Sequence, residues 1–266
     1  MSSSTTNVVV GGASGMGLAV AAALAERGPL LVADRDVEAA EAVAKALGTE
    51  ALGVECDVTD SAHVRALRSR VERLGSLVIT AGLSPHMARG DSIYAVNLVG
   101  TTCVLGEFED AVEVGSVAIC FASMAGHLMV PPQPVLDVID NPLAQDFFGR
   151  LRAAGVDPGD PNMAYLISKL GVIRIVRRLA PEWGRRGGRI LSLSPGVIDT
   201  PMGKLEAQEI PGLEDMMNGL PISRLGRPEE IASVVAFLCS DGASYMTGSD
   251  VLVDGGSVAM MPGLPQ

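Results

Sequence analysis

Short apolar runs alternate with helix-forming segments from one end of the chain to the other, which limits the possible folds more than any other feature. The runs are rich in β-branched residues or leucine and apolar throughout, as strands buried on both faces are. Such strands, separated by helices, predict a parallel sheet covered on both sides. The runs are residues 7–10, 30–34, 51–56, 77–80, 116–122, 189–194 and 250–254. We therefore expect one α/β domain over residues 1–266, with a doubly wound, seven-stranded parallel sheet and helices on both faces.

Residues 130–161 interrupt this alternation, because they are rich in proline and place an extra helical segment before the next expected helix. Asn141 can cap a helix that has Pro142 in its first turn, and Gly155 can end that helix near Ala154. The sequence thus predicts a helical insertion.

The predicted insertion helix carries three large apolar residues at i, i+4, i+8 spacing: Leu143, Phe147 and Leu151. Such a stripe has to be buried against something. The following helix is capped by Asp160, starts at Pro161 and continues through NMAYLISKLGVIRIV, which is apolar nearly all round. We expect the insertion to pack beside this helix, near the mouth of the binding pocket. There it would either displace a contact between subunits or become part of one.

Composition excludes several classes of partner. Apolar residues make up 48% of the chain and charged residues 19%, which suits a sizeable core, and the net charge of −11 disfavours nucleic acid and anionic membranes. The four cysteines lie far apart and form no metal-ligand pattern with histidine, so we expect no metal and a cytoplasmic protein with reduced thiols. These cysteines are Cys56, Cys103, Cys120 and Cys239.

The sequence GGASGMG follows the first run and opens a helix, with Gly11, Gly15 and Gly17 in the pattern GxxxGxG. The chain must turn sharply there, approach a pyrophosphate and pack the helix close to the sheet, and a Cβ obstructs each of these. The helix N-terminus then offers free N–H groups to the phosphates. This junction predicts a dinucleotide cofactor.

Asp34 ends the second run, where a carboxylate can accept hydrogen bonds from an adenosine ribose and repels a 2′-phosphate. It therefore favours NAD. Arg35 can accommodate a 2′-phosphate, which leaves NADP as the less favoured alternative. Asp34 could also serve only as the cap of the helix that starts at Val37, although Asp36 fits that role equally well.

Motifs along essentially the whole chain are similar to those of the short-chain dehydrogenase/reductase family, whose members have a Rossmann fold. The motifs are GGASGMG at 11–17, DV at 57–58, AG at 81–82, VN at 96–97, ASMAG at 122–126, YLISK at 165–169, PGVIDTP at 195–201, RLGRPEEIA at 224–232 and VLVDGG at 251–256. The insertion, NMAYLISK and the methionine-bearing tail resemble the 3α-hydroxysteroid dehydrogenase/carbonyl reductase branch. Val10 and the pair Ile79-Thr80 depart from the family pattern of threonine and Asn-Asn, which we expect to weaken hydrogen bonding around the glycine loop.

The resemblance implies a role for each of five residues. Tyr165 would be the acid/base and Lys169 its activator, which also holds the nicotinamide ribose. Ser123 would orient the substrate oxygen, Asn97 would hold a water of the proton relay, and Thr200 would anchor the carboxamide. The implied cofactor site comprises Gly11, Ser14, Gly15, Met16, Gly17, Asp34, Arg35, Asp57, Val58, Ala81, Gly82, Tyr165, Lys169, Pro195, Gly196, Val197 and Thr200.

Physical chemistry supports the pairing of Tyr165 with Lys169, since residues at i and i+4 share a helix face. A free tyrosine has a pKa near 10, too high for acid/base work at neutral pH. A cation about 4 Å away, at an effective dielectric constant near 20, contributes roughly 4 kcal/mol, or about three pKa units. The three histidines, His63, His86 and His127, match no motif; His127 could line the pocket or lie in a surface turn.

We read the chain as an NAD-dependent oxidoreductase that interconverts a secondary alcohol and a ketone. The loop 201–222 suggests an apolar substrate, because methionine suits an adaptable wall, and a steroid, a terpenoid or an aromatic alcohol fits equally well. Its apolar residues are Met202, Leu205, Ile210, Leu213, Met216 and Met217. The rival interpretation is a catalytically idle NAD-binding regulator or scaffold. We expect a homodimer or homotetramer assembled through residues 228–256.

Overall fold

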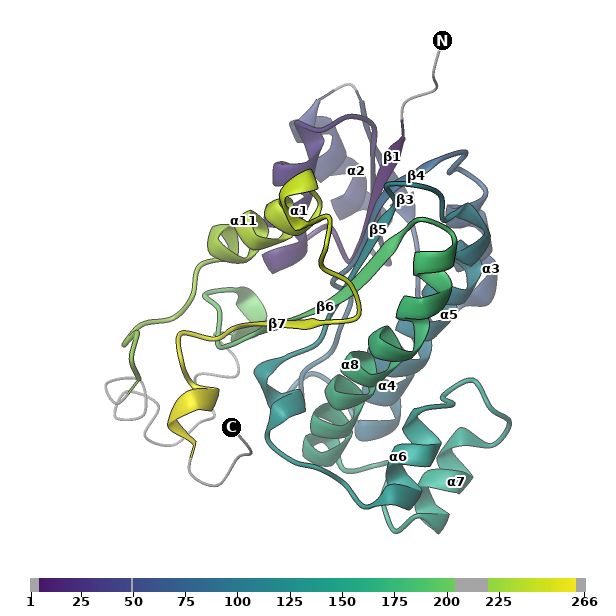
Figure 1. Cartoon of the computed structure of the whole chain (residues 1–266), viewed down its shortest axis with the longest axis vertical. Coiled ribbons are helices and arrows are strands. Elements are labelled where there is room, and N and C mark those ends of the chain that lie inside the picture. Colours follow the sequence, from purple (N-terminus) through teal and green to yellow (C-terminus); the bar gives the residue numbers. More distant parts are fainter. Residues whose placement is uncertain (1–4, 49, 204–219, 262–266) are drawn as a thin grey trace.

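A seven-stranded parallel sheet forms the centre of the protein, in a computed structural model that describes residues 5–48, 50–203 and 220–261 (Figure 1). The strand order is β3-β2-β1-β4-β5-β6-β7, and every pairing is parallel. The strands are β1 Thr6–Val10, β2 Leu30–Asp34, β3 Ala51–Glu55, β4 Leu74–Ile79, β5 Val117–Phe121, β6 Arg189–Pro195 and β7 Asp250–Val253. The predicted α/β architecture is confirmed.

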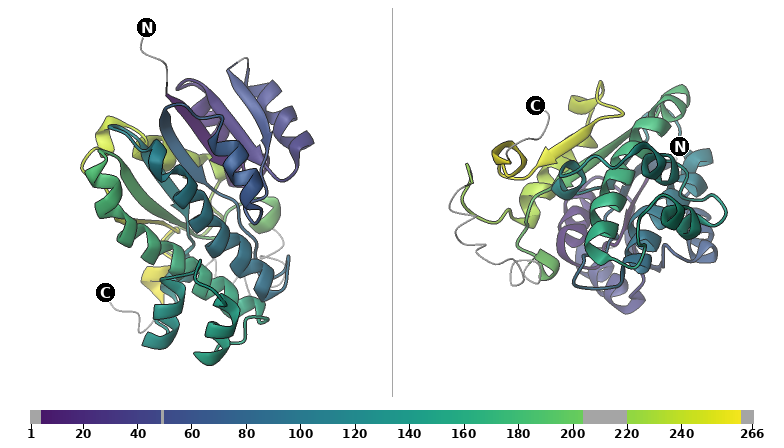
Figure 2. Two further views of the ribbon diagram at one scale, coloured as in Figure 1. Left: turned by 90° about the vertical axis from the view of Figure 1, so that its right-hand side faces the viewer. Right: turned by 90° about the horizontal axis from the view of Figure 1, so that it is seen from below.

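Helices cover both faces of the sheet, as the two further views show (Figure 2). They are α1 Gly15–Ala25, α2 Val37–Leu47, α3 Ser61–Arg68, α4 Gly90–Tyr94, α5 Thr101–Phe108, α6 Gln133–Ile139, α7 Phe147–Ala153, α8 Pro161–Arg185 and α11 Pro228–Leu238. A π-helical segment, Ala95–Gly100, joins α4 to α5, and a short 3-10 turn, η3, spans Met124–His127. No helix among the described residues is long and apolar enough to cross a membrane.

Alternation of side chains along the strands divides the core in two, because successive residues of a strand point to opposite faces. On β6, Leu191 and Leu193 are fully buried in the cluster shared with α1 and α11. On β1, Val8 and Val10 belong to the other cluster, which includes residues of α5 and α8. Three helices begin at aspartate caps: Asp36 accepts from Ala39 N, Asp60 from Ala62 N, and Asp160, as predicted, from Asn162 N.

The insertion forms two short helices, α6 and α7, which lie beyond the N-terminal part of α8 and close to α4 (Figure 1). Phe147 and Leu151 are buried, as predicted, in the core cluster shared with α8. The Phe147 ring meets Tyr94 of α4 edge to face, with centroids 5.7 Å apart. Asp140, at the end of α6, accepts two hydrogen bonds of 2.7 Å from Arg174 of α8.

The predicted start of the insertion helix is wrong. Helix α7 begins after Asp146, whose carboxylate accepts from Gly149 N, and not at Asn141. Asn141 instead closes α6: its backbone N–H donates to Val138 O and its side chain to Asp137 O. Leu143 therefore lies outside the buried stripe and is 54% exposed.

Candidate active site

A cavity of about 610 Å³ opens at the carboxyl ends of the strands, where the strand order reverses between β1 and β4. Open α/β sheets bind their ligands at this topological switch point. Most residues predicted for the site line the cavity: Gly11, Ser14, Gly15, Met16, Gly17, Asp34, Arg35, Asp57, Val58, Ala81, Gly82, Ser123, Tyr165, Lys169, Pro195, Gly196 and Thr200. Its volume lies within the range of small-molecule sites.

The glycine loop turns from β1 into α1 and leaves no room for side chains at two positions. Gly11 has φ +85°, and a Cβ on Gly17 would lie 2.0 Å from Gly11 O. Gly15, with φ +52°, faces the cavity, since a Cβ there would point toward Thr200 at 3.5 Å. The Ser14 side chain makes no hydrogen bond to the first turn of α1, which leaves those N–H groups for a ligand. These features fit the pyrophosphate of a dinucleotide.

Thr80 corrects the expectation that departures from the family pattern weaken this loop. Its hydroxyl lies 2.9 Å from Val10 O and 3.0 Å from Gly11 O, and its backbone N–H donates to Val10 O. The threonine therefore ties the end of β4 to the start of the glycine loop.

Asp34 lies in the cavity and its Oδ2 accepts a hydrogen bond of 3.1 Å from Ala13 N in the glycine loop. Asp36 caps α2, so the capping role once open for Asp34 belongs to its neighbour. Arg35 also lines the cavity. Just after the next strand, β3, hydrogen bonds from the Thr59 side chain and then its backbone hold the pKa of Asp57 below the usual range.

Tyr165 and Lys169 both reach the cavity from one face of α8. The Lys169 Nζ atom lies 5.7 Å from the centroid of the Tyr165 ring and donates to Phe121 O at 3.0 Å. Lys169 is 6% exposed. The ammonium group of Lys169 is therefore buried beside the Tyr165 ring.

Ser123 follows β5 and caps η3, its hydroxyl accepting from Ala125 N at 3.1 Å. It lines the cavity together with Tyr165 and is buried. Strand β5 thus delivers a hydroxyl group to the same space that α8 supplies with a phenol and an ammonium group.

Asn97 lies behind the cavity, on the π-helical segment. Its side chain accepts from Leu83 N at 2.7 Å and donates to Leu83 O at 2.9 Å. A Cβ on Gly82 would lie 3.4 Å from both Asn97 Oδ1 and Lys169 Nζ, which places the amide near the ammonium group. Single π-helical turns within α-helices are frequent at functional sites.

Two predicted residues need a more precise placement. Thr200 lines the cavity, but its hydroxyl accepts from Gly203 N at 3.0 Å and lies 3.4 Å from Ile198 O. Val197 lines a second, smaller cavity of about 120 Å³ next to the first.

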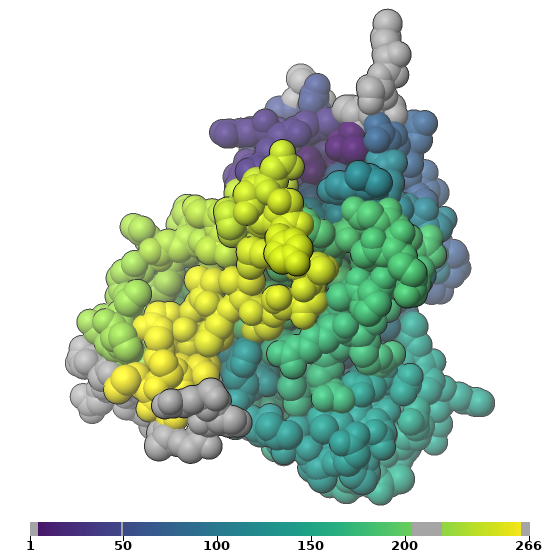
Figure 3. All heavy atoms as spheres, in the orientation of Figure 1, coloured from purple at the N-terminus to yellow at the C-terminus, as the bar shows by residue number. Residues whose placement is uncertain are grey.

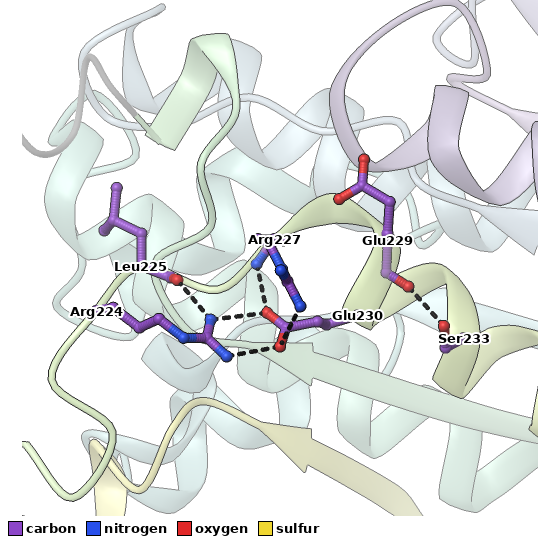
Figure 4. A network of polar contacts seen from close by, with 6 residues as sticks. All are labelled: Arg224, Leu225, Arg227, Glu229, Glu230 and Ser233. Atoms are coloured by element: carbon purple, nitrogen blue, oxygen red, sulfur yellow. Dashed lines mark hydrogen bonds and ion pairs between the residues drawn. The ribbon is translucent and has the colours of Figure 1, made fainter.

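The RLGRPEEIA segment reaches this second cavity through Arg224 and Glu230. Glu230 accepts hydrogen bonds from the guanidinium of Arg224 and from the backbone and side chain of Arg227, which orders the chain entering α11 (Figure 4). The hydrogen bonds from Arg224, and then the one from Arg227 N, lower the pKa of Glu230 to about 2. The acid is thus an N-terminal capping group of α11.

The cavity has further lining residues for which the sequence predicted no role in the site. Five apolar residues line it as well, and of these only Met202 was predicted to do so: Leu83, Met87, Ala95, Val96 and Met202. Of the other four, Val96 belongs to the VN motif and Ala95 precedes it, whereas Leu83 and Met87 follow AG at 81–82. Closeness in sequence to a motif was therefore the available signal. The predicted loop residues Leu205, Ile210, Leu213, Met216 and Met217 lie outside the described residues.

His127, left open between the pocket and a turn, does not line the cavity; it ends η3. His63 lies on α3 and its Nδ1 accepts from Asp57 N at 3.3 Å. Within the described ranges, no group of three or more histidine, cysteine, aspartate or glutamate side chains is arranged to hold a metal.

Comparisons with known proteins give consistent matches. A family model described as short chain dehydrogenase matches residues 5–135, and one described as Enoyl-(Acyl carrier protein) reductase matches residues 152–258. A short-chain dehydrogenase/reductase of Alternaria brassicicola is 32% identical over 97% of each chain. The 3-alpha-hydroxysteroid dehydrogenase/carbonyl reductase of Comamonas testosteroni is 31% identical over 96% of each chain.

Among solved structures, the fold is similar to that of a 7 alpha-hydroxysteroid dehydrogenase complexed with NADH and 7-oxo glycochenodeoxycholic acid. The TM-score is 0.76 at 24% identity, over 95% of this chain and 93% of the other.

Proposed function

The chain belongs to the short-chain dehydrogenase/reductase family, and we propose that it interconverts a secondary alcohol and a ketone with NAD as the preferred cofactor. The observation that carries this proposal is the meeting of Ser123, Tyr165 and Lys169 at one cavity that also contains the glycine loop. A catalytically idle NAD-binding regulator, the alternative function, would have no need of a hydroxyl, a phenol and a buried ammonium group in that space.

The proposed chemistry divides between the cofactor and the protein. When bound, the nicotinamide supplies or accepts the hydride. Tyr165 gives a proton to the ketone oxygen or takes one from the alcohol, and Lys169 stabilises the phenolate between these events. Ser123 donates a hydrogen bond to the substrate oxygen, which orients the reacting carbon. Asn97 extends the proton path behind Lys169, and Thr200 anchors the carboxamide.

The preference for NAD is proposed from the position of Asp34 at the adenosine end of the cavity. Its carboxylate faces the glycine loop, as the hydrogen bond from Ala13 N shows. A 2′-phosphate there would meet this negative charge, whereas a ribose hydroxyl could donate to it. Arg35 is the feature that would favour NADP instead.

The proposed substrate is largely apolar, because large apolar side chains line the cavity: Leu83, Met87, Val96 and Met202. A flexible lining of this kind accepts alicyclic and aromatic carbon skeletons. The relative from Comamonas testosteroni, named for a hydroxysteroid and carbonyl compounds, agrees with this class. A steroid, a terpenoid or an aromatic alcohol remains the proposed range.

Assembly and location are part of the same proposal. Strand β7 lies at the edge of the sheet, and it lies next to α8 on one face of the molecule (Figure 3). Large apolar side chains are exposed on and around it: Phe237 at 49%, Tyr245 at 103% and Leu252 at 38%. We propose a homodimer or homotetramer built through α11 and β7. All four cysteines are free thiols, which supports the cytoplasm.

The deciding experiment is a turnover assay with cyclohexanol, 1-phenylethanol, androsterone and their ketones, each with NAD(H) and NADP(H), followed at the absorbance of the reduced nicotinamide. We expect turnover of at least one pair, with NAD preferred. NADH binding, measured by fluorescence, without turnover of any pair would favour the regulator. Preference for NADP would show that Arg35, rather than Asp34, sets the cofactor.

A further inference from the structure

His127 makes contacts that the proposed chemistry does not use. It ends η3, and its Nε2 atom lies 2.9 Å from Asp250 Oδ2 at the start of β7 and 3.3 Å from Ser194 Oγ on β6. One imidazole ring therefore connects the turn after Ser123 with two strands of the sheet.

Asp250 is an aspartate buried at the edge of the sheet, with its side chain 4% exposed. Its Oδ1 accepts from Ser192 Oγ at 2.5 Å and from Ser194 Oγ at 3.0 Å, while its Oδ2 faces His127. Burying a carboxylate is costly unless hydrogen bonds replace its water. The serines and the histidine supply those bonds, so the cluster is a closed polar network.

The cluster cannot act as a nucleophilic triad. Ser192 and Ser194 are both fully buried, and both hydroxyls are within hydrogen-bond distance of Asp250. Because no substrate reaches these hydroxyls, we assign the network a structural role.

This structural role follows from the contacts that hold η3, the turn that Ser123 caps. At its start, Ala122 N donates to Leu193 O at 2.8 Å. In its middle, Gly126 packs so closely on α8 that a Cβ would lie 3.0 Å from Leu170 N. At its end, His127 binds Asp250. The Ser123 hydroxyl accepts from Ala125 N inside this turn, so its position depends on the geometry of the whole turn.

We propose that His127 and Asp250 are positioning residues that fix η3 on the sheet and so aim the Ser123 hydroxyl at the substrate oxygen. The proposal rests on the proposed function, in which Ser123 orients that oxygen. Loss of the histidine leaves the turn held at two points rather than three. The hydroxyl then occupies a wider range of positions, and small displacements of an orienting group lower the rate.

The test compares His127→Leu, which removes the contact, with His127→Gln, whose amide nitrogen can reach the position of Nε2. Arg68→Gln is the matched control. It removes an ion pair to Asp110 from a side chain that is 21% exposed, against 27% for His127, on a helix remote from η3.

Hydrogen exchange of the full-length protein gives a readout that needs no substrate. The amides of Ala125, Gly126 and Leu128 each donate within the turn. They should exchange faster in His127→Leu, while the wild type, His127→Gln and Arg68→Gln stay alike. Equal exchange in the wild type and His127→Leu overturns the proposal, even if the wild type turns over no ketone and the proposed function has failed.

Kinetics with the most active ketone of the panel give the second readout. We expect kcat/KM of His127→Leu to fall about tenfold, His127→Gln to restore most of it, and NADH affinity to stay unchanged. In a Ser123→Ala background, His127→Leu should lower kcat/KM by less than about twofold, because the two residues act as one unit. A loss of equal size in both backgrounds overturns the proposal, as does a loss that Arg68→Gln reproduces. If His127→Leu does not fold, His127→Asn, which is too short to reach Asp250, takes its place in both readouts.

Discussion

A substitution at Phe147 measures how much the packing of the insertion contributes to the stability of the domain. Its ring is 6% exposed and meets Tyr94 and Phe148 edge to face, at centroid distances of 5.7 and 5.4 Å. Removing a buried phenyl group costs about 3 to 5 kcal/mol. In a chain of this length, that lowers the melting temperature by about 6 to 10 °C. We therefore expect Phe147→Ala to show a drop of this size in calorimetry or thermal circular dichroism.

Leu143→Ala is the control, because sequence spacing placed Leu143 in the same stripe whereas the structure leaves it 54% exposed. Its unfolding free energy should stay within about 0.5 kcal/mol of wild type. The reasoning fails if the two variants melt together. It also fails if Phe147→Ala shows a separate early transition with the main one unmoved, since the insertion would then not share the core with α8.

Three further predictions concern the site and the core. Tyr165→Phe should bind NADH nearly as wild type does and lose about two orders of magnitude or more in kcat, and near-normal turnover would point to another acid. Asp34→Ser should narrow the NAD-over-NADP ratio of kcat/KM by at least about tenfold, and an unchanged ratio would remove Asp34 from cofactor choice. Burial raises the pKa of Cys56 and of Cys120 to about 12. The unfolded chain loses these protons from about pH 9 and the folded chain does not, so chemical denaturation should show stability falling between about pH 9 and 12, by up to about 1.4 kcal/mol per pH unit for each thiol. Cys120→Ala should reduce that slope.

The sheet could be predicted from the sequence because each strand carries its own signal. The run predicted at 189–194 is the strand Arg189–Pro195, and that at 30–34 is Leu30–Asp34. Short apolar runs of this kind, bounded by polar or glycine residues, fit few structures other than a buried parallel strand. The cap at Asp160 could be predicted for the same reason, since it needs only the amides that follow it.

The insertion was harder because its first helix was not recognised. No helix was predicted over PPQPVLDVI, yet Pro132 occupies the N-cap position of α6 and Pro134 lies in its first turn, where no N–H is needed. Once α6 exists, Asn141 is required at its end and cannot start the next helix. A cap rule applied to one position cannot detect that a preceding helix has already used the residue.

The polar groups on β6 and η3 make contacts that sequence motifs do not predict. Ser192 and Ser194 alternate with buried leucines in a strand that has α11 on the leucine side. A hydroxyl on the other side of such a strand needs a partner, and for both serines that partner is Asp250, which also binds His127. The histidine and the aspartate are 123 residues apart, so no local pattern joins them. Thr80 is a similar case, because its two carbonyl partners lie on β1 and in the glycine loop. The family motifs thus specify the groups proposed for the chemistry, whereas the residues that would hold those groups in place depend on contacts made only when distant strands and turns meet.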